Sequence, residues 1–384
     1  MIEVEQNLWE QAPLTEGVTP NIMQDIAPHT KSLGSQPLTF IDLFAGIGGF
    51  HLAMHNNGAK CVFASEWDKF ARQTYEANFR TIEPELFTQG RFAGDINAVN
   101  LDDIPPFDIL CAGFPCQPFS YAGLGQGFED QTRGTLFFEI CKIIEHHQPK
   151  AVFLENVKGI VSHKQGKTLQ TILSCLNDLG YETHWKVISS LDFGLPQKRE
   201  RWYCVAFAKH QVQFKFPKPL GGTPTLRDII DSTNNDAALK LTQFELERIQ
   251  YHFNHSSKQE RVQHDSSKYA PHTKKGKYGI FSYQKADGSL RFHVGDKAKT
   301  QIQEAFYACL DTYAPTIIAG RTPKLWDLKR KLSVLEAKRL QGFPDEFIMP
   351  VSDNQAYKQL GNSVSVPVIT AIAEEILKVL NNKK

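Results

Sequence analysis

The stretch Leu38-Thr-Phe-Ile-Asp-Leu-Phe-Ala-Gly-Ile-Gly-Gly49 decides the fold class. Its apolar residues up to Phe44 are typical of a buried strand, and a helical pattern follows the glycines through Met54. A strand, a glycine turn and a helix make a unit whose helix N-terminus can receive an anion or a polar cofactor. The turn at Gly46 and Gly48 reads G-x-G-G, which is weaker evidence than the longer dinucleotide fingerprint.

Further apolar runs alternate with helical patterns along the next part of the chain. Strands are expected at 60–64, 108–113, 150–154 and 202–207, with helices at 136–144 and 159–179. This alternation predicts an α/β fold with a doubly wound, mostly parallel sheet.

Polar residues follow the second expected strand. Glu66 and Trp67 come directly after it, and Asp95 lies in a later loop. An acidic residue at the end of a second strand commonly binds a ribose diol. Together with the glycine turn, these residues suit an adenosine without a phosphate, because no Gly-Lys-Ser/Thr phosphate clamp is present. The alternative is that Glu66 and Asp95 only cap strand ends.

Cys116 lies just beyond another strand, in a loop between Pro115 and Pro118. The two prolines fix the backbone near the thiol, which suits a nucleophile at the carboxyl end of a sheet. Most free cysteines are small buried hydrophobes, so this position alone does not decide the question. Glu155 ends the next strand and is expected at the same edge of the sheet.

Composition sets broad limits on the protein. The 384 residues are 41% hydrophobic and 22% charged, with a net charge of +1, as is ordinary for a globular protein. No run of apolar residues is long enough for a membrane span, and no secretory signal is recognisable. Seven scattered cysteines without ligand spacing indicate a reduced, cytoplasmic chain and no metal site.

Charge and pattern divide the chain. Residues 251–300 hold ten Lys or Arg and four Asp or Glu, which fits either phosphate contact or a solvated loop. We expect a flexible extension at 1–37 with a short helix near 21–26, a catalytic domain at 38–208, a smaller irregular domain at 209–354 and a returning segment at 355–384. Residues 277–283 and 290–294 alternate as strands do. Ser333 to Glu336 is predicted to be the capping box of a helix that ends at Gly342. Residues 357–367 are predicted to form a polar turn before an apolar helix.

Six motifs, taken together and in order, resemble the cytosine-C5 DNA methyltransferases of bacterial restriction–modification systems. The resemblance runs from Phe40 to about Ile376 and rests on Asp42-Leu-Phe-Ala-Gly-Ile-Gly-Gly-Phe50, Gly113-Phe-Pro-Cys-Gln-Pro-Phe-Ser120, Glu155-Asn-Val157, Gln197-Lys-Arg-Glu-Arg201, Arg339-Leu-Gln-Gly-Phe-Pro344 and Gly361-Asn-Ser363. It implies a Rossmann-like methyltransferase fold, S-adenosylmethionine as methyl donor, and a target-recognition role for the smaller domain.

The resemblance also implies roles for individual residues. In the cofactor pocket, Glu66 would bind the ribose, and the other residues would be Phe44, Gly46, Gly48, Trp67, Asp95, Ile96, Pro115, Leu136, Asn362 and Ser363. Cys116 would attack C6 of a cytosine flipped out of the duplex, and Glu155 would protonate N3. Arg201 would hold O2 and steady the nearby carboxylate and loop, with Arg199 as the second candidate. The expected DNA contacts are Gln117, Ser120, Lys274, Lys275, Lys277 and Arg291.

Partners and alternatives follow from the same resemblance. It implies a monomer in the bacterial cytoplasm, associated with the nucleoid through duplex DNA, with no membrane contact. A cognate restriction endonuclease would act on the same site without a stable complex. The first alternative is a transfer-RNA cytosine-C5 methyltransferase, against which Gly113, Phe114 and the long variable region speak. The second is a DNA-binding regulator without activity, which intact Cys116, Glu155 and Arg201 disfavour.

Overall fold

The computed structural model describes most of the chain. The described residues are 36–115, 136–208, 212–243, 246–247, 262–264, 278–284, 290–296, 302–308, 310–319, 322–325 and 327–381. The short helix expected near 21–26 lies outside these ranges. Within them, no helix is both long and apolar enough to cross a membrane.

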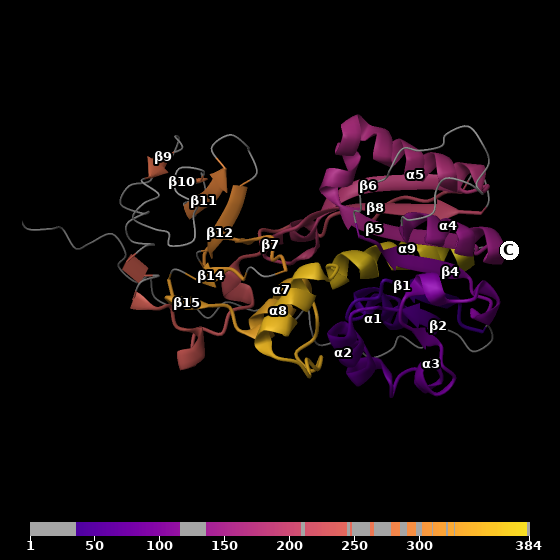
Figure 1. Ribbon diagram of the computed structural model, residues 1–384, viewed down its shortest axis with the longest axis horizontal. Helices are drawn as coiled ribbons and strands as arrows, with labels where there is room; N and C mark the ends of the chain where they lie inside the picture. The colour runs from indigo at the N-terminus through magenta and orange to yellow at the C-terminus, as the bar shows by residue number, and fades with distance from the viewer. Residues whose placement is uncertain are drawn as a thin grey trace, which may run out of the picture.

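Seven strands form the largest described sheet (Figure 1). In spatial order they are β3 (Phe92–Ala93), β2 (Lys60–Ser65), β1 (Thr39–Leu43), β4 (Ile109–Gly113), β5 (Ala151–Val157), β8 (Glu200–Phe207) and β6 (Glu182–Ser189). The strands from β3 to β5 run parallel, whereas β8 is antiparallel to both of its neighbours. The mostly parallel α/β sheet expected from the sequence is confirmed. Its chain order reverses between β1 and β4, where open α/β sheets bind ligands.

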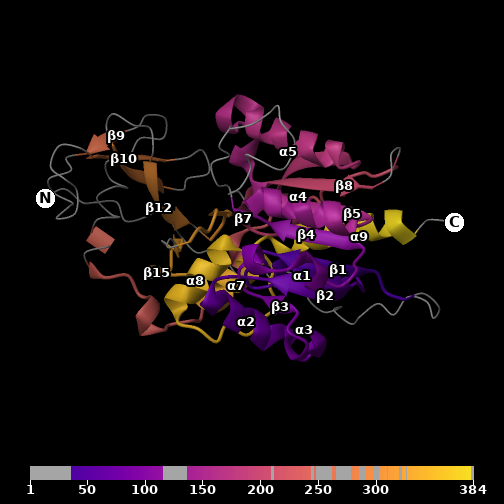
Figure 2. The same ribbon diagram turned by 45° about the vertical axis from the view of Figure 1, so that its right-hand side comes forward.

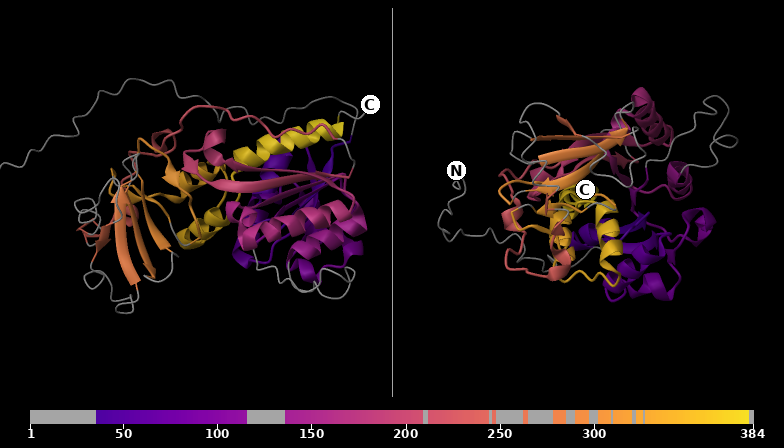
Figure 3. Two further views of the ribbon diagram at one scale, coloured as in Figure 1. Left: turned by 90° about the horizontal axis from the view of Figure 1, so that it is seen from above. Right: turned by 60° about the vertical axis from the view of Figure 1, so that its left-hand side comes forward.

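Helices cover both faces of this sheet (Figure 3). One face carries α1 (Gly49–Asn56), α2 (Lys69–Phe79), α3 (Pro84–Thr88) and α9 (Val366–Asn381), and the other carries α4 (Leu136–His147) and α5 (Lys167–Asp178). Each strand serves both layers because its side chains alternate between faces. Phe40 packs in the first layer and its neighbour Ile41 in the second.

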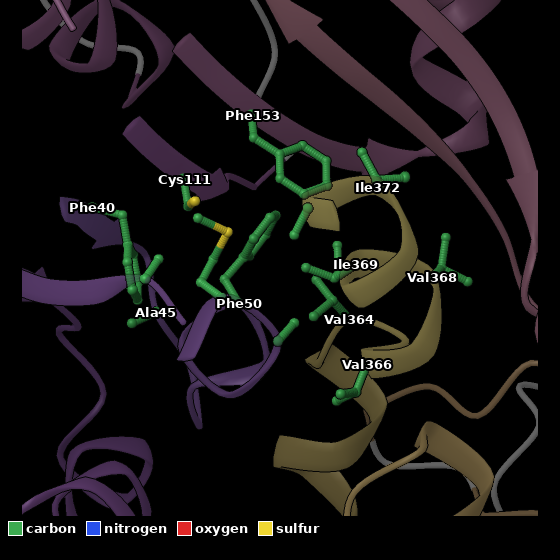
Figure 4. Close-up of a cluster of buried hydrophobic side chains, with 14 of the residues drawn as sticks. Phe40, Ala45, Phe50, Cys111, Phe153, Val364, Val366, Val368, Ile369 and Ile372 are labelled. Atoms are coloured by element: carbon green, nitrogen blue, oxygen red, sulfur yellow. The ribbon is translucent and has the colours of Figure 1, made fainter. Parts of the chain in front are cut away.

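The last helix returns the end of the chain to the first βα unit. Figure 2 shows α9 alongside the strands of the seven-stranded sheet, close to α1. In Figure 4, Ile369 and Ile372 of α9 lie beside Phe50 of α1 and Phe153 of β5. The two phenyl rings meet edge to face, with centroids 5.0 Å apart. The C-terminal segment therefore completes the hydrophobic core on this face.

A second, mainly antiparallel sheet stands apart from the first (Figure 1). Its strands are β15 (Arg330–Lys331), β14 (Lys324–Leu325), β12 (Ile302–Ala308), β11 (Leu290–Asp296), β10 (Tyr278–Gln284) and β9 (Val262–His264). The strands expected at 277–283 and 290–294 correspond to β10 and β11, which pair antiparallel.

The two sheets are joined by a pair of short strands and two helices. β13 (Ala314–Pro315) pairs parallel with β7 (Gln197–Lys198), and α7 (Val334–Gln341) and α8 (Asp353–Asn362) follow the second sheet. The expected capping box of α7 is present, since the Glu336 amide donates to Ser333 Oγ at 3.2 Å. Gly342 ends α7 with a φ of 80°, and a Cβ there would lie 2.3 Å from Pro367.

One strand was missed, and two local expectations are wrong. The edge strand β6 was not expected, because its sequence Glu182-Thr-His-Trp-Lys-Val-Ile-Ser189 is largely polar, and most of its residues are half-buried or exposed. The helix expected at 159–179 begins only at Lys167, after short 3-10 turns in which Lys164 and Gln165 take positive φ values. Residues 357–362 belong to α8 rather than to a turn.

Candidate active site

Glu66 lies immediately after β2 and is held by backbone donors. Its Oε2 accepts a hydrogen bond from the Gly46 amide at 2.8 Å, and its Oε1 accepts one from the Asp68 amide at 2.8 Å. The residue is only 8% exposed. Burial raises the pKa of the carboxyl, while the Asp68 and Gly46 amides oppose that shift. Glu66 is thus fixed between the glycine turn and the start of α2.

The glycine turn has a strained backbone and an open side. Phe44, Gly46 and Gly48 have φ values of 56°, 56° and 88°. A Cβ on Gly48 would lie 2.2 Å from the Phe79 ring, so glycine is needed there for packing as well as for conformation. A Cβ on Gly46, by contrast, would have no other atom within 4 Å. Gly48 therefore allows close packing, and Gly46 leaves space beside the Glu66 carboxylate.

The neighbouring strand ends add an exposed aromatic ring. Trp67 is 82% exposed although it adjoins the buried Glu66, whose amide donates to Ala93 O of β3 at 3.1 Å. Asp95 follows β3, is exposed, and caps the short turn that begins at the buried Ile96. An uncovered indole, a fixed carboxylate and open space beside Gly46 fit an adenosine group, which needs a stacking face and a diol acceptor.

Four other expected cofactor residues lie on different elements. Ser363 caps the C-terminus of α8 and is close to the start of α1, since a Cβ on Gly49 would lie 3.3 Å from Ser363 Oγ. Asn362 is the last residue of α8. Pro115 is exposed after the end of β4, and Leu136 is the half-buried first residue of α4.

Glu155 and Arg201 form an ion pair across adjacent strands. The Arg201 Nε lies 3.2 Å from Glu155 Oε1, and both side chains are largely buried. The antiparallel register places Arg201 opposite Val157, two residues beyond Glu155 on the same face of β5. Burial raises the Glu155 pKa, while Arg201 and then Arg199 lower it. The carboxyl therefore holds its proton to a higher pH than an ordinary glutamate does.

The end of β4 brings the chain to Glu155. Gly113 is paired with Glu155 in the β4–β5 register, and a Cβ on Gly113 would lie 3.7 Å from Glu155 Oε2. Asn156 Nδ2 donates to Phe114 O at 2.8 Å and so fixes the residue that follows β4. Cys116, Gln117 and Ser120 lie outside the described residues, as do Lys274, Lys275 and Lys277. Arg291 is in β11, of which only the backbone is described.

Arg199 lies close to this pair but has a different set of partners. Its guanidinium donates to the carbonyl oxygens of Ile317, Gly361 and Ser363. It influences Glu155 through its charge, whereas Arg201 contacts the carboxylate directly. Arg199 and Arg201, separated by one residue, therefore have different partners: Arg199 binds backbone carbonyls and Arg201 binds the Glu155 carboxylate.

Two residues near the site were missed by sequence reasoning. One is Asn156, described above. The other is Gln197, which is fully buried: its Oε1 accepts from the Ile317 amide at 2.8 Å, and its Nε2 donates to Leu340 O and Gln341 Oε1. Both residues lie inside motifs of the family resemblance, and this was the signal that could have identified them. An amide side chain alone, however, does not reveal its hydrogen-bond partner.

Comparisons with known proteins match this geometry. A family model for C-5 cytosine-specific DNA methylase matches residues 38–378. The chain is 42% identical over 354 residues to the type II methyltransferase M.HpaII of Haemophilus parainfluenzae, covering 90% of this chain and 91% of that protein. It is 40% identical to M.NlaX of Neisseria lactamica, with 89% and 96% covered.

A solved structure supports the fold independently. The crystal structure of S. pombe Dnmt2 methyltransferase superposes with a TM-score of 0.61 at 19% identity, covering 90% of this chain and all of that one. At that identity the likeness concerns the fold alone. The family model spans the glycine turn, the β4 loop, the Glu155–Arg201 pair and the returning helix α9. The chain belongs to the C-5 cytosine-specific DNA methylase family.

Proposed function

We propose that this DNA cytosine-C5 methyltransferase acts on a cytosine turned out of the duplex, with Cys116 as its nucleophile and Glu155 and Arg201 around the base. The activity and its methyl donor, S-adenosylmethionine, follow from family membership. The observation that carries the residue assignment is the buried Glu155–Arg201 pair, 3.2 Å apart, at the level where β4 leads toward Cys116. A base within a stacked duplex cannot reach such a position, so flipping is required.

The cofactor is assigned to the other half of the site. Glu66 would accept hydrogen bonds from the ribose hydroxyls, and Phe44 and Trp67 would pack on the adenine. Asp95 and Ile96 would contact the adenine edge, and Asn362 and Ser363 would complete the pocket with Pro115 and Leu136 at its margin. The open space beside Gly46 and the uncovered Trp67 support this assignment. When bound, S-adenosylmethionine supplies the electrophilic methyl group that C5 accepts.

The protein's own groups would prepare C5 for that transfer. The Cys116 thiolate forms a bond to C6, and the electron pair of the ring moves toward N3, where Glu155 delivers its proton. Arg201 donates to O2 and keeps the Glu155 carboxyl oriented. After methylation, loss of the C5 proton to water lets the ring expel Cys116, and the N3 proton returns to Glu155. The raised pKa of Glu155 supports its role as the proton donor.

The second sheet would read the target sequence. We assign residues 38–208 to catalysis and cofactor binding, 209–354 to target recognition, and 355–384 to the segment that returns to the catalytic domain, after an extension at 1–37. Base edges would be read in the grooves, with Lys274, Lys275, Lys277 and Arg291 as candidate contacts beside Gln117 and Ser120 near the nucleophile. The basic excess in 251–300 supports this placement.

The biological setting is proposed from the bacterial relatives. The enzyme would protect host DNA against a cognate endonuclease of the same sequence specificity, without forming a stable complex with it. It would act as a monomer in the cytoplasm, on nucleoid DNA. The transfer-RNA alternative has less support, because the matching family model is described as a DNA methylase and the bacterial relatives are type II methyltransferases.

One assay tests the substrate and the nucleophile together. Purified enzyme with labelled S-adenosylmethionine should label bacterial genomic DNA and leave transfer RNA unlabelled. Cys116→Ser should lower transfer to DNA by about a thousandfold or more while leaving cofactor binding intact. Cys175→Ser on α5 is the matched control and should retain wild-type activity. Absence of label in DNA with the wild-type enzyme would refute the proposal, and bisulfite sequencing of the labelled DNA would identify the target cytosine.

A further inference from the structure

Three chain segments that are distant in sequence meet at the Arg199 side chain. Its Nη1 donates to Ile317 O at 2.8 Å, and its Nη2 donates to Gly361 O at 3.1 Å and to Ser363 O at 2.5 Å. The residue is 2% exposed, and burial lowers the pKa of its guanidinium to about 9, so it stays charged at neutral pH. Among the described residues, the hydrogen bonds of this guanidinium all go to carbonyl oxygens, and a buried charge bound in this way is costly unless its geometry is fixed.

Two of these carbonyls belong to the C-terminus of α8. This helix ends at Asn362 with Ser363 as its cap, and the last carbonyls of a helix lack partners within the helix. A cation placed there satisfies them and interacts favourably with the helix dipole. Arg199 therefore fixes where α8 ends, and with it the positions of Asn362 and Ser363.

Gly361 brings the other segment into direct contact with the same turn. A Cβ on Gly361 would lie 2.4 Å from both Ile318 C and Ala319 N, and 2.8 Å from Ile318 O. These are backbone atoms and cannot move aside as a flexible side chain could. The absence of a side chain at Gly361 is thus what allows residues 317–319 to lie against the end of α8.

The β7 segment also holds residues 316 and 317. Gln197 Oε1 accepts from the Ile317 amide at 2.8 Å, and Thr316 Oγ1 donates to Lys198 O at 2.7 Å. Residues 314–315 pair with β7 and connect, through β12, to the second sheet. The segment that leaves the second sheet and the end of α8, which is expected to support the cofactor, are therefore both hydrogen-bonded to one guanidinium.

We propose that Arg199 is a positioning residue that couples cofactor binding to DNA binding by holding the end of α8 and residues 317–319 in one arrangement. The inference rests on the proposed roles of Asn362, Ser363 and the second sheet. We call the contact of Arg199 with the end of α8 and residues 317–319 the joint. When two ligand-binding segments share such a joint, the ligand that binds first bears the entropic cost of ordering it, and the second ligand binds more tightly. Without the joint, each ligand must order its own segment.

The test measures this coupling in the full-length enzyme. The probe is S-adenosylhomocysteine, the demethylated product of the donor, titrated with and without a duplex containing the target site. We expect the duplex to tighten probe binding by about fivefold or more in the wild type. In Arg199→Gln, probe affinity without DNA should fall about tenfold, and the duplex should no longer change it. Arg199→Lys should recover only part of this, because an ammonium lacks the planar fork that reaches both segments.

Gly361→Ala provides a second route to the same joint. Alanine favours helix more than glycine does, so an effect on coupling would come from the collision with residues 318 and 319 and not from helix propensity. It should reproduce the loss of coupling with Arg199 intact, and the double variant should be no worse than either single one. Lys186→Gln, which removes an exposed charge on β6, should leave coupling unchanged.

Each result decides between distinct roles. Uncoupled binding in the wild type, or normal coupling in the folded Arg199→Gln and Gly361→Ala variants, would overturn the inference. A fall in kcat with unchanged probe affinity and coupling would make Arg199 a catalytic residue instead. Loss of thermal stability with unchanged coupling would make it merely structural. Because the probe is not a methyl donor, these binding results stand even if the proposed roles of Cys116 and Glu155 fail in the transfer assay.

Discussion

Two glutamates at the same edge of the seven-stranded sheet are equally buried and have different partners. Glu66 and Glu155 are each 8% exposed, and burial raises the pKa of both. Backbone amides of Gly46 and Asp68 hold Glu66, whereas the Arg201 side chain holds Glu155. Equal burial therefore does not imply equal chemistry.

The difference lies in what each partner can do. Backbone amides are fixed donors without net charge, so they orient the Glu66 carboxylate and leave it to accept further hydrogen bonds. The Arg201 guanidinium contributes a full charge at 3.2 Å, which stabilises the ionised form of Glu155 against the effect of burial. A carboxyl balanced in this way can both release and recover a proton. We assign binding to Glu66 and proton transfer to Glu155 on this basis.

Of the substitutions at these two glutamates, Glu155→Gln should have the larger effect, and that effect is on turnover. Glu155→Gln keeps the shape of the side chain but cannot deliver a proton to N3, so kcat should fall about a hundredfold or more. S-adenosylhomocysteine affinity should remain within about twofold of the wild type, since Glu155 is outside the cofactor pocket. Single-turnover transfer to duplex DNA measures the first quantity and calorimetry the second. A variant with wild-type turnover would remove Glu155 from the mechanism.

The matched substitution at Glu66 should act on binding. Glu66→Gln replaces a charged acceptor of the ribose hydroxyls with a neutral one, so the KM for S-adenosylmethionine should rise about tenfold or more. The kcat at saturating donor should change far less than in Glu155→Gln. Steady-state kinetics over a range of donor concentrations separates the two. Equal losses of kcat in both variants would mean that the two carboxyls do not divide the work as proposed.

The first half of the main sheet could be predicted because its strands are buried on both faces. Such strands appear as continuous apolar runs, and glycines and acidic residues mark their ends, as at Gly46 and Glu66. The edge strand β6 could not be recognised, because an edge strand packs on one side and its sequence alternates weakly. The end of α8 was predicted as a turn, because Gly361 and Asn362 are residues typical of turns.

Residue patterns predicted which side chains form the site, whereas only the family resemblance placed Arg201 near the Glu155 carboxylate, and the partners of Arg199 were not predicted. Glu155 and Arg201 meet only because β8 runs antiparallel to β5, and a mostly parallel pattern gives no hint of that reversal. The partners of Arg199 are carbonyl oxygens 118 to 164 residues away, and every residue carries a carbonyl. Sequence patterns identify side chains with unusual chemistry, and contacts to the backbone have no such signature.

A smaller effect should appear in the pH dependence of turnover. The Arg201 guanidinium lowers the Glu155 pKa, so Arg201→Gln should raise it further. If protonated Glu155 is the acid, the alkaline limb of the kcat profile moves to higher pH, while maximal kcat falls about tenfold from the lost contact with O2. Measurements of kcat from pH 5.5 to 10 test this, and Lys186→Gln should reproduce the wild-type profile. A limb that stays in place would exclude Glu155 as the titrating group.

The smallest effect concerns Asp42, the buried residue of β1 that precedes the glycine turn. Burial raises its pKa well above the usual value, and the negative charge of Glu66 raises it further. In the unfolded chain the Asp42 carboxyl ionises above about pH 4, whereas in the folded protein it stays protonated to a higher pH. The stability that this difference contributes is complete below about pH 4 and is lost as the pH rises through the pKa of folded Asp42. Asp42→Asn cannot ionise, and its Tm relative to the wild type should therefore increase from pH 5 to pH 8, by roughly 2 °C or more.

A second variant tests whether Glu66 takes part in this titration. In a Glu66→Gln background the neighbouring charge is absent, so Asp42 should ionise more readily in the folded state and Tm should depend less steeply on pH. Glu155→Gln removes a carboxyl of equal burial from the other half of the site and should leave the Asp42 effect unchanged. An identical change in the slope of Tm against pH in both backgrounds would show that the overall charge of the protein, rather than the proximity of Glu66, controls the ionisation of Asp42.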